Sequence, residues 1–160
     1  MITIFTALYP EAKELIRALS LKKDMTQNHF QVFSDENNQI QIVITGASAI
    51  AAATAVAECS TRREPDSGDF LINYGSCAGR KNIPVGTVSL CNKLTQTVDG
   101  RTFYPDILYR HPFEEAELYS FPAVQDRESF QQFLDKDAGA GDRRKEILVD
   151  MRSEEHTSEL

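Results

Sequence analysis

Glu11 is the first residue whose type and place in the sequence suit chemistry. Only Tyr9 and Pro10 separate it from the apolar, β-rich run "ITIFTAL" (2–8), and a segment with helical periodicity follows it. A carboxylate in the first turn of a helix is stabilised as the anion by about 0.3–1 kcal/mol, because the helix dipole is positive there. An ionised carboxylate just after a strand could carry chemistry; the alternative is an ordinary first-turn glutamate.

The segment "NYGSCAG" (73–79) is a second candidate. An apolar run, which we expect to be a buried strand, leads into it, and small residues dominate it. Glycine lets a ligand approach the backbone closely, and α/β folds bind small molecules at the carboxyl ends of their strands. The alternative is a tight turn that merely needs small residues.

The possible nucleophiles in this segment match no known catalytic pattern. Ser76 lacks the GxSxG elbow of serine hydrolases. Cys77 has no evident histidine partner, so a small buried packing thiol is the stronger interpretation. The three histidines, His29, His111 and His156, are not spaced as metal ligands.

Strands alternate with helices along the chain. After Pro10, which the first helical turn tolerates, apolar residues recur at helical spacing from Ala12 to Leu19. Residues 99–115 have no clear period and are expected to form a loop or flap. This alternation predicts an α/β layered domain with a mixed sheet. The other expected elements are strands at 29–34 and 39–45, an alanine-rich helix at about 48–62, strands within 69–79 and 85–98, a helix within 126–137 and a strand at 145–151.

Bulk composition limits the class of protein. The 160 residues fit one domain, and a net charge of -7 disfavours a sequence-independent binder of nucleic acid or of anionic membranes. Three widely spaced cysteines, Cys59, Cys77 and Cys91, argue against a disulfide framework or a zinc site. The sequence shows no signal-peptide pattern, GxGxxG fingerprint or P-loop, so we expect a soluble, cytoplasmic protein.

Taken in order, these segments resemble the nucleoside phosphorylase/nucleosidase superfamily, nearest to its 5'-methylthioadenosine/S-adenosylhomocysteine nucleosidase branch. The resemblance covers nearly all of 1–151 and rests on "TALYPEAKEL", "TGASAIAAATA", "FLINYGSCAG", "IPVGTVSL" and "LVDM". It implies a three-layer α/β/α domain around a mixed, partly closed central sheet that is incomplete at the C-terminus. It also implies a purine nucleoside as substrate, and neither a metal nor an organic cofactor.

The resemblance gives the first two candidates roles in one reaction. Glu11 would position and deprotonate the attacking water, and Ser76 would lie in the loop under the ribose. That loop also comprises Gly75, Cys77, Ala78 and Gly79. Cleaving an N-ribosyl bond passes through an oxocarbenium-like sugar, which a carboxylate and polar groups around the hydroxyls would stabilise.

Two further residues would contact the substrate. Met151, in "LVDM", matches a methionine that lies along the ribose in the family. Phe121 is a candidate for stacking on the base, with a core aromatic as the alternative. Ala47, in place of a larger apolar residue, and the unusual flap leave the base and the 5' group open.

The resemblance leaves more than one activity open. Phosphorylases of the superfamily hold phosphate with arginines in the N-terminal turn and on the strand before the glycine-rich loop. Here those places carry "ALYPEA" and Asn73, which favours water as the nucleophile, although Arg101 in the flap could serve a phosphate. A non-catalytic nucleoside-binding module on the same fold is a third alternative.

The last segment, "RSEEHTSEL" (152–160), has a different character. It is the in-frame translation of AGATCGGAAGAGCACACGTCTGAACTC, which resembles a widely used DNA sequencing adapter. We therefore expect 1–151 to be a partial nucleosidase domain and 152–160 a non-native tail. The resemblance expects a ribose-binding glutamate and a catalytic aspartate after Met151. On that expectation the chain alone is inactive, whereas its parent is an enzyme and a homodimer.

Overall fold

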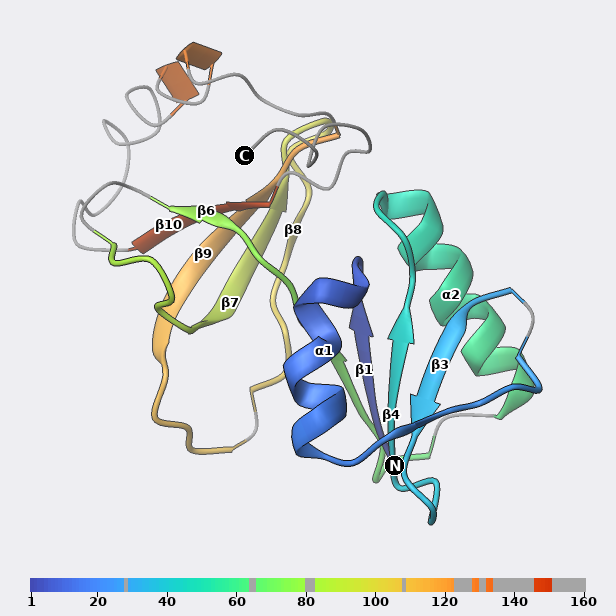
Figure 1. Cartoon of the computed structure of the whole chain (residues 1–160). Helices are drawn as coiled ribbons and strands as arrows, with labels where there is room; N and C mark the ends of the chain where they lie inside the picture. The colour runs from blue at the N-terminus through green and yellow to red at the C-terminus, as the bar shows by residue number, and fades with distance from the viewer. Residues whose placement is uncertain are drawn as a thin grey trace. The chain divides into compact units, whose positions relative to one another are not determined.

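The computed structural model describes residues 1–27, 29–63, 66–79, 83–107, 109–122, 128–129, 132–133 and 146–150. The chain divides into two compact units, Met1–Ser76 and Cys77–Leu160. Among the described residues, each unit contains a mixed five-stranded sheet (Figure 1). The predicted α/β class with a mixed sheet is confirmed, with two sheets instead of one.

The sheet of the first unit has the order β2-β3-β4-β1-β5. Its centre is parallel: β1 (Ile2–Thr6) lies between β4 (Ile40–Ile44) and β5 (Phe70–Asn73). β3 (Gln31–Ser34) and β2 (Lys22–Lys23) extend the sheet by antiparallel pairing. The carboxyl ends of the three parallel strands therefore meet at one end of the sheet.

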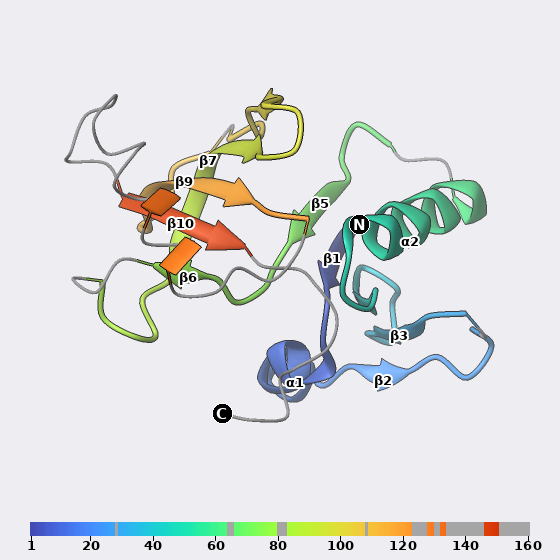
Figure 2. The ribbon, with the colours of Figure 1, turned by 90° about the horizontal axis from the view of Figure 1, so that it is seen from above.

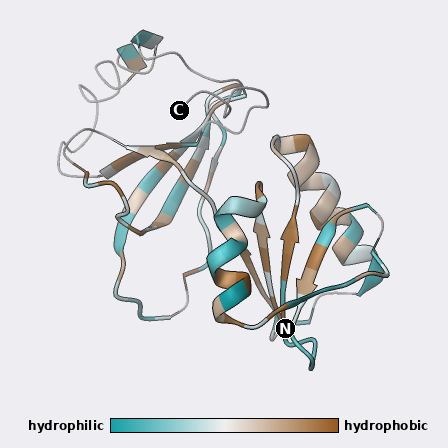
Figure 3. Cartoon of the chain, viewed as in Figure 1, coloured by the Kyte–Doolittle hydropathy of each residue, from teal (hydrophilic) through white to brown (hydrophobic). Residues whose placement is uncertain are grey.

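One helix covers each face of this sheet (Figure 2). Neighbouring residues of β1 point to opposite faces, so Ile4 packs under α1 (Tyr9–Ala18) and Phe5 packs under α2 (Ala49–Arg62). The strands between them are strongly hydrophobic (Figure 3). The cluster under α1 comprises Ile4, Ala12, Ile16, Leu21, Phe33 and Ile42, and the cluster under α2 comprises Phe5, Val32, Val43 and Ala55.

Local sequence explains where both helices begin. Pro10 lies in the first turn of α1, as predicted, where its missing N–H costs no helical hydrogen bond. α2 begins directly after Ser48, whose hydroxyl oxygen accepts the Ala51 N–H at 3.2 Å. The helix predicted at about 48–62 is confirmed. Within the described residues, no helix has the length and apolar character that crossing a membrane requires.

β5 departs from its prediction in one respect. Its apolar sequence predicts a buried strand, but Phe70, Leu71 and Ile72 are 53%, 57% and 40% exposed. β5 is the edge strand of its sheet, and the clusters under the two helices draw their strand residues from β1, β3 and β4. The exposure of β5 therefore follows from its position at the edge of the sheet and not from its apolar sequence.

The sheet of the second unit has the order β6-β10-β9-β7-β8. Three parallel strands form its centre: β7 (Ser89–Gln96), β9 (Glu114–Ser120) and β10 (Glu146–Asp150). β6 (Ala78–Gly79) and β8 (Thr102–Phe103) are antiparallel to their neighbours at its two edges. The strands predicted within 85–98 and 145–151 are confirmed in shorter form.

The segment expected to be a flap is more ordered than its sequence indicates. β8 and the first residues of β9 fall within 99–115, and β9 continues to Ser120. Glutamate is disfavoured in strands, so "EEAELYS" gives a weak strand signal, yet Ala116 and Leu118 alternate into the core of this unit. Most of the helix expected at 126–137 lies outside the described residues.

Candidate active site

Glu11 is at the third position of α1, and its side chain turns back over the helix N-terminus. Oε2 accepts the N–H of Leu8, the residue that caps the helix, at 3.0 Å. The N–H of Glu11 donates to the Leu8 carbonyl oxygen at 3.1 Å. This is the ordinary first-turn role that the sequence allows, because it satisfies one of the free N–H groups of the helix start.

Thr6 adds a second donor to the same oxygen. Its hydroxyl donates to Oε2 of Glu11 at 3.0 Å. Thr6 ends β1 and is fully buried, at 0% exposure. Sequence reasoning missed Thr6, because a residue five positions before a helical glutamate does not match any helix-capping pattern. Only the turn between β1 and α1 brings the two side chains together.

Ser76 supplies two more donors, both to the other oxygen. Its N–H and its hydroxyl donate to Oε1 of Glu11 at 2.9 Å and 2.6 Å. β5 runs parallel to β1, and the Tyr74 N–H donates to the Phe5 carbonyl oxygen at 2.9 Å just beyond β5. The chain therefore leaves β5 at the end of the sheet where α1 begins. The structure brings together two segments that the sequence analysis singled out separately.

These contacts control the charge of Glu11. Partial burial raises its pKa, but the Ser76 hydroxyl, the Ser76 and Leu8 N–H groups and the Thr6 hydroxyl together lower it below the ordinary glutamate value. Each of these four donors is a neutral group, so the carboxylate keeps its full negative charge. At neutral pH, Glu11 is ionised and can accept a proton or hold a polar ligand.

The last three residues of the small-residue loop, Cys77, Ala78 and Gly79, belong to the second unit. Ala78 and Gly79 form β6, opposite Val149 and Leu148 of β10. A side chain at Gly79 would meet Ile83 Cδ1 at 3.1 Å and Leu148 Cδ2 at 3.3 Å, so these side chains would have to shift to admit it. The roles of these backbone groups under a ribose stay predictions.

Cys77 is exposed, so the buried packing thiol that the sequence favoured is not found. Partial burial and the nearby carboxylate of Asp150 raise its pKa, which disfavours the nucleophilic thiolate. The raised pKa gives no support for a nucleophilic role. Its expected place under the ribose, like that of Gly75 in the first unit, stays a prediction.

The two other substrate contacts expected from the sequence are in the second unit. Phe121 follows β9, and its N–H donates to the Asp150 carbonyl oxygen at 3.2 Å. Its ring packs edge to face on that of Phe133, with the ring centroids 5.0 Å apart. The ring of Phe133 also packs on that of Tyr119, with the ring centroids 5.0 Å apart. Stacking of Phe121 on a base stays a prediction. Met151 lies outside the described residues.

Arg101, the guanidinium considered for a phosphate, contacts the Asp99 carboxylate at 3.1 Å within its own turn. Across the part of the chain that the structure describes, no group of three or more histidine, cysteine and acidic side chains is placed to hold a metal ion.

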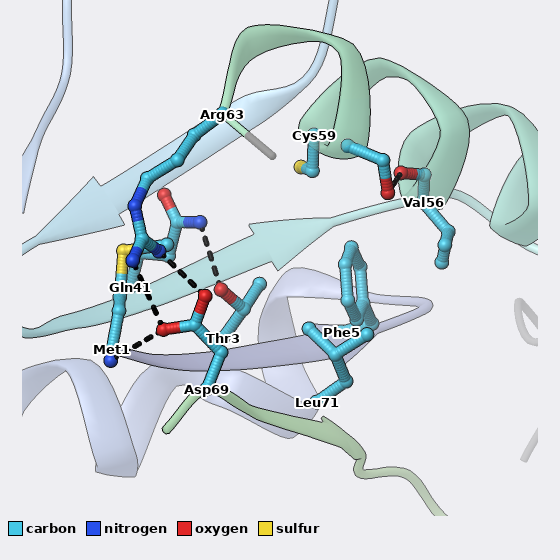
Figure 4. A pocket seen from close by; sticks show the side chains of 10 residues that line it. Met1, Thr3, Phe5, Gln41, Val56, Cys59, Arg63, Asp69 and Leu71 are labelled. Carbon is cyan, nitrogen blue, oxygen red and sulfur yellow. Dashed lines mark hydrogen bonds and ion pairs between the residues drawn. The ribbon is translucent and has the colours of Figure 1, made fainter. Parts of the chain in front are cut away.

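A small cavity lies at the opposite, amino-terminal end of β1 and β5 (Figure 4). Asp69, 7% exposed, contacts the N-terminal amino group at 2.7 Å and the Arg63 guanidinium at 2.8 Å. The Asp66 N–H, the amino group and Arg63 hold the pKa of Asp69 far below its usual range. Because these charges compensate one another, we interpret this end of the sheet as structural.

Solved structures similar to this chain include several nucleosidases. The 5'-methylthioadenosine/S-adenosylhomocysteine nucleosidase from Neisseria meningitidis, in complex with methylthio-immucillin-A, has a TM-score of 0.71 and 18% identity, covering 95% of this chain and 75% of that chain. The 5'-methylthioadenosine nucleosidase of Arabidopsis thaliana has a TM-score of 0.67 and 13% identity, covering 94% and 80%. A futalosine hydrolase mutant of Helicobacter pylori has a TM-score of 0.62 and 13% identity, covering 94% and 78%.

These similarities show the fold. The chain has the α/β fold of the nucleosidases, as the resemblance of its sequence segments implied. The sequence matches no protein-family model and no curated protein.

Proposed function

We propose that this protein is a nucleosidase that hydrolyses the N-ribosyl bond of purine nucleosides of the 5'-methylthioadenosine/S-adenosylhomocysteine type. Its nucleosidase fold supports the proposal. The observation that carries it is the Glu11–Ser76 pair at the carboxyl ends of β1 and β5. Ligands of α/β folds bind at this end of the sheet.

In this proposal Glu11 acts on the attacking water, and Ser76 contacts the ribose. Glu11, ionised at neutral pH, holds a water molecule and accepts its proton as the water attacks the sugar carbon and the C–N bond to the purine breaks. The negative charge of Glu11 also stabilises the oxocarbenium-like sugar. The purine leaves with a proton, which the aspartate expected after Met151 would donate. The family resemblance assigns Ser76 a place under the ribose with Gly75 and the Cys77–Gly79 backbone, and assigns Met151 to the ribose and Phe121 to the base.

Water suits this site better than phosphate. A phosphate nucleophile would lie beside the Glu11 carboxylate, whose donors are all neutral, and two anions repel at such a distance. Arg101 pairs with Asp99. Hydrolysis therefore ranks above phosphorolysis, and a non-catalytic nucleoside-binding module is the remaining alternative.

The nucleosidase from Neisseria meningitidis binds methylthio-immucillin-A, which supports a nucleoside as the ligand. The base and the 5' group are the parts of the substrate that experiment has to define. We also expect a cytoplasmic homodimer that requires no cofactor.

Release of base from 5'-methylthioadenosine, S-adenosylhomocysteine and other purine nucleosides tests the proposal, on the product of the complete gene. Glu11→Gln should lower kcat by about 10²–10⁴-fold, because the amide cannot accept the proton of water. Substrate binding, measured by calorimetry, should persist. Glu14→Gln is the matched control, since Glu14 is on the same helix but pairs with exposed Arg17.

Two results would change the assignment. Base release that requires phosphate, with ribose 1-phosphate as the product, would establish a phosphorylase. Nucleoside binding without turnover under any condition would establish a binding module.

A further inference from the structure

The two oxygens of Glu11 are held in different ways. Oε2 accepts from the Thr6 hydroxyl and the Leu8 N–H, both at 3.0 Å. The Leu8 N–H is part of the helix start and cannot turn away. Within the described part of the chain, Oε1 accepts from Ser76 alone, through its N–H and its hydroxyl.

Thr6 is a rigid donor. It is paired with Ile44 in the parallel sheet, and its carbonyl oxygen accepts the Thr45 N–H at 2.8 Å. The side chain is fully buried, and a β-branched residue has few rotamers open to it. Turning the Thr6 O–H away from Oε2 would leave a buried donor without a partner, which is unfavourable, so this hydroxyl holds Oε2 in place.

Ser76 is the donor that can exchange. It lies beyond the end of β5 and is exposed, and a hydroxyl rotates about its Cβ–O bond at little cost. A carboxylate has about four lone-pair sites, and four donors already occupy those of Glu11. A water molecule can bind to Glu11 only when one donor turns away, and the Ser76 hydroxyl is the one free to do so.

We propose that Thr6 is a positioning residue for the reaction: with the Leu8 N–H it immobilises Oε2 of Glu11, so that Oε1 is the oxygen that receives the attacking water when the Ser76 hydroxyl turns to the substrate. This inference rests on the proposed nucleosidase function. Without the Thr6 hydroxyl, Oε2 offers a second place for water, and the carboxylate can rotate away from Ser76.

The test compares two substitutions at Thr6 in the product of the complete gene. Thr6→Val keeps the shape and removes the hydroxyl, and Thr6→Ser keeps the hydroxyl. Thr6→Val should lower kcat by about 10- to 100-fold with little change in KM, because the base is misplaced while the substrate contacts remain. It should also move the acidic limb of the kcat/KM profile to higher pH, since the anion loses a donor. Thr6→Ser should keep kcat and the acidic limb of the pH profile close to those of the wild type.

Thr3→Val is the matched control. Thr3 is on the same strand and is 2% exposed, but its hydroxyl accepts from the Gln41 side chain instead of contacting Glu11. Circular dichroism and thermal unfolding confirm that each variant folds. The inference is overturned if folded Thr6→Val keeps wild-type kcat and pH profile, or if Thr3→Val loses as much kcat as Thr6→Val does.

A second measurement separates this inference from the proposed function. NMR titration of the Glu11 carboxyl carbon requires no turnover, and Thr6→Val should raise the pKa of Glu11 whereas Thr3→Val should not. A wild-type protein that releases no base from any nucleoside contradicts the proposed function. An unchanged Glu11 pKa in Thr6→Val contradicts the Thr6 inference whether or not the protein is active.

Discussion

Ser76 donates twice to one oxygen of Glu11, through its hydroxyl at 2.6 Å and its N–H at 2.9 Å. The two residues are 65 positions apart in the chain. The parallel pairing of β1 with β5 brings them together, because both strands end at the same side of the sheet. One of the two donors can rotate and the other cannot, so substitutions can separate their contributions.

Ser76→Ala removes the rotating donor and leaves the N–H in place. We expect kcat/KM to fall by about 2- to 10-fold, because alanine cannot hydrogen-bond to the substrate and such a bond contributes about 0.5–1.5 kcal/mol. Ser76→Thr keeps a hydroxyl and should retain most of the activity. Steady-state kinetics check both variants; a folded Ser76→Ala enzyme with wild-type kcat/KM would contradict the role of this hydroxyl.

The pH dependence of the reaction reports the pKa of Glu11. Its four hydrogen bonds favour the anion and lower that pKa, so the carboxylate stays ionised to a lower pH than an ordinary glutamate does. The acidic limb of the kcat/KM profile should therefore lie below about pH 4.3, the usual glutamate value. Ser76→Ala should move it upward, and an acidic limb above that value in the wild type would argue against Glu11 as the base.

Asp69 is expected to contribute to stability at neutral pH. Its pKa is far below the usual range in the folded protein, so its contribution is present above the unfolded-state pKa and is lost as the pH falls through the folded-state value. Asp69→Asn should lower Tm by several degrees at pH 7, and the difference from wild type should shrink as the pH falls below about 4. Calorimetry at a series of pH values measures it; a difference that grows in acid would refute the assignment.

Gly79→Ala tests the packing between β6 and β10. The new methyl group would lie 3.1 Å from Ile83 Cδ1 and 3.3 Å from Leu148 Cδ2, so these side chains would have to shift. We expect the free energy of unfolding to fall by about 1–3 kcal/mol, the usual effect of overpacking. Gly68→Ala is the control, because no described atom lies within 4 Å of the added carbon. Urea unfolding of both variants should show a loss only for Gly79→Ala.

Local sequence determined the helices of the first unit and the residue types of the site. Pro10 and Ser48 mark where α1 and α2 begin, because a missing N–H and a hydroxyl acceptor both suit a helix start. Glu11 and the loop at 75–79 could be singled out from the sequence, since a first-turn carboxylate and a run of small residues are local patterns. The α/β class followed from the alternation of such elements.

Tertiary structure alone decided how these parts meet. No spacing rule connects Thr6, Glu11 and Ser76; they converge because parallel strands end together and the turn after β1 folds back. The same cause explains where the predictions for β5 and β9 were wrong. β5 is exposed because it is an edge strand. The glutamate-rich β9 is a strand because Ala116 and Leu118 pack into the core of the second unit. Burial and pairing depend on partners distant in the chain, which a local pattern cannot specify.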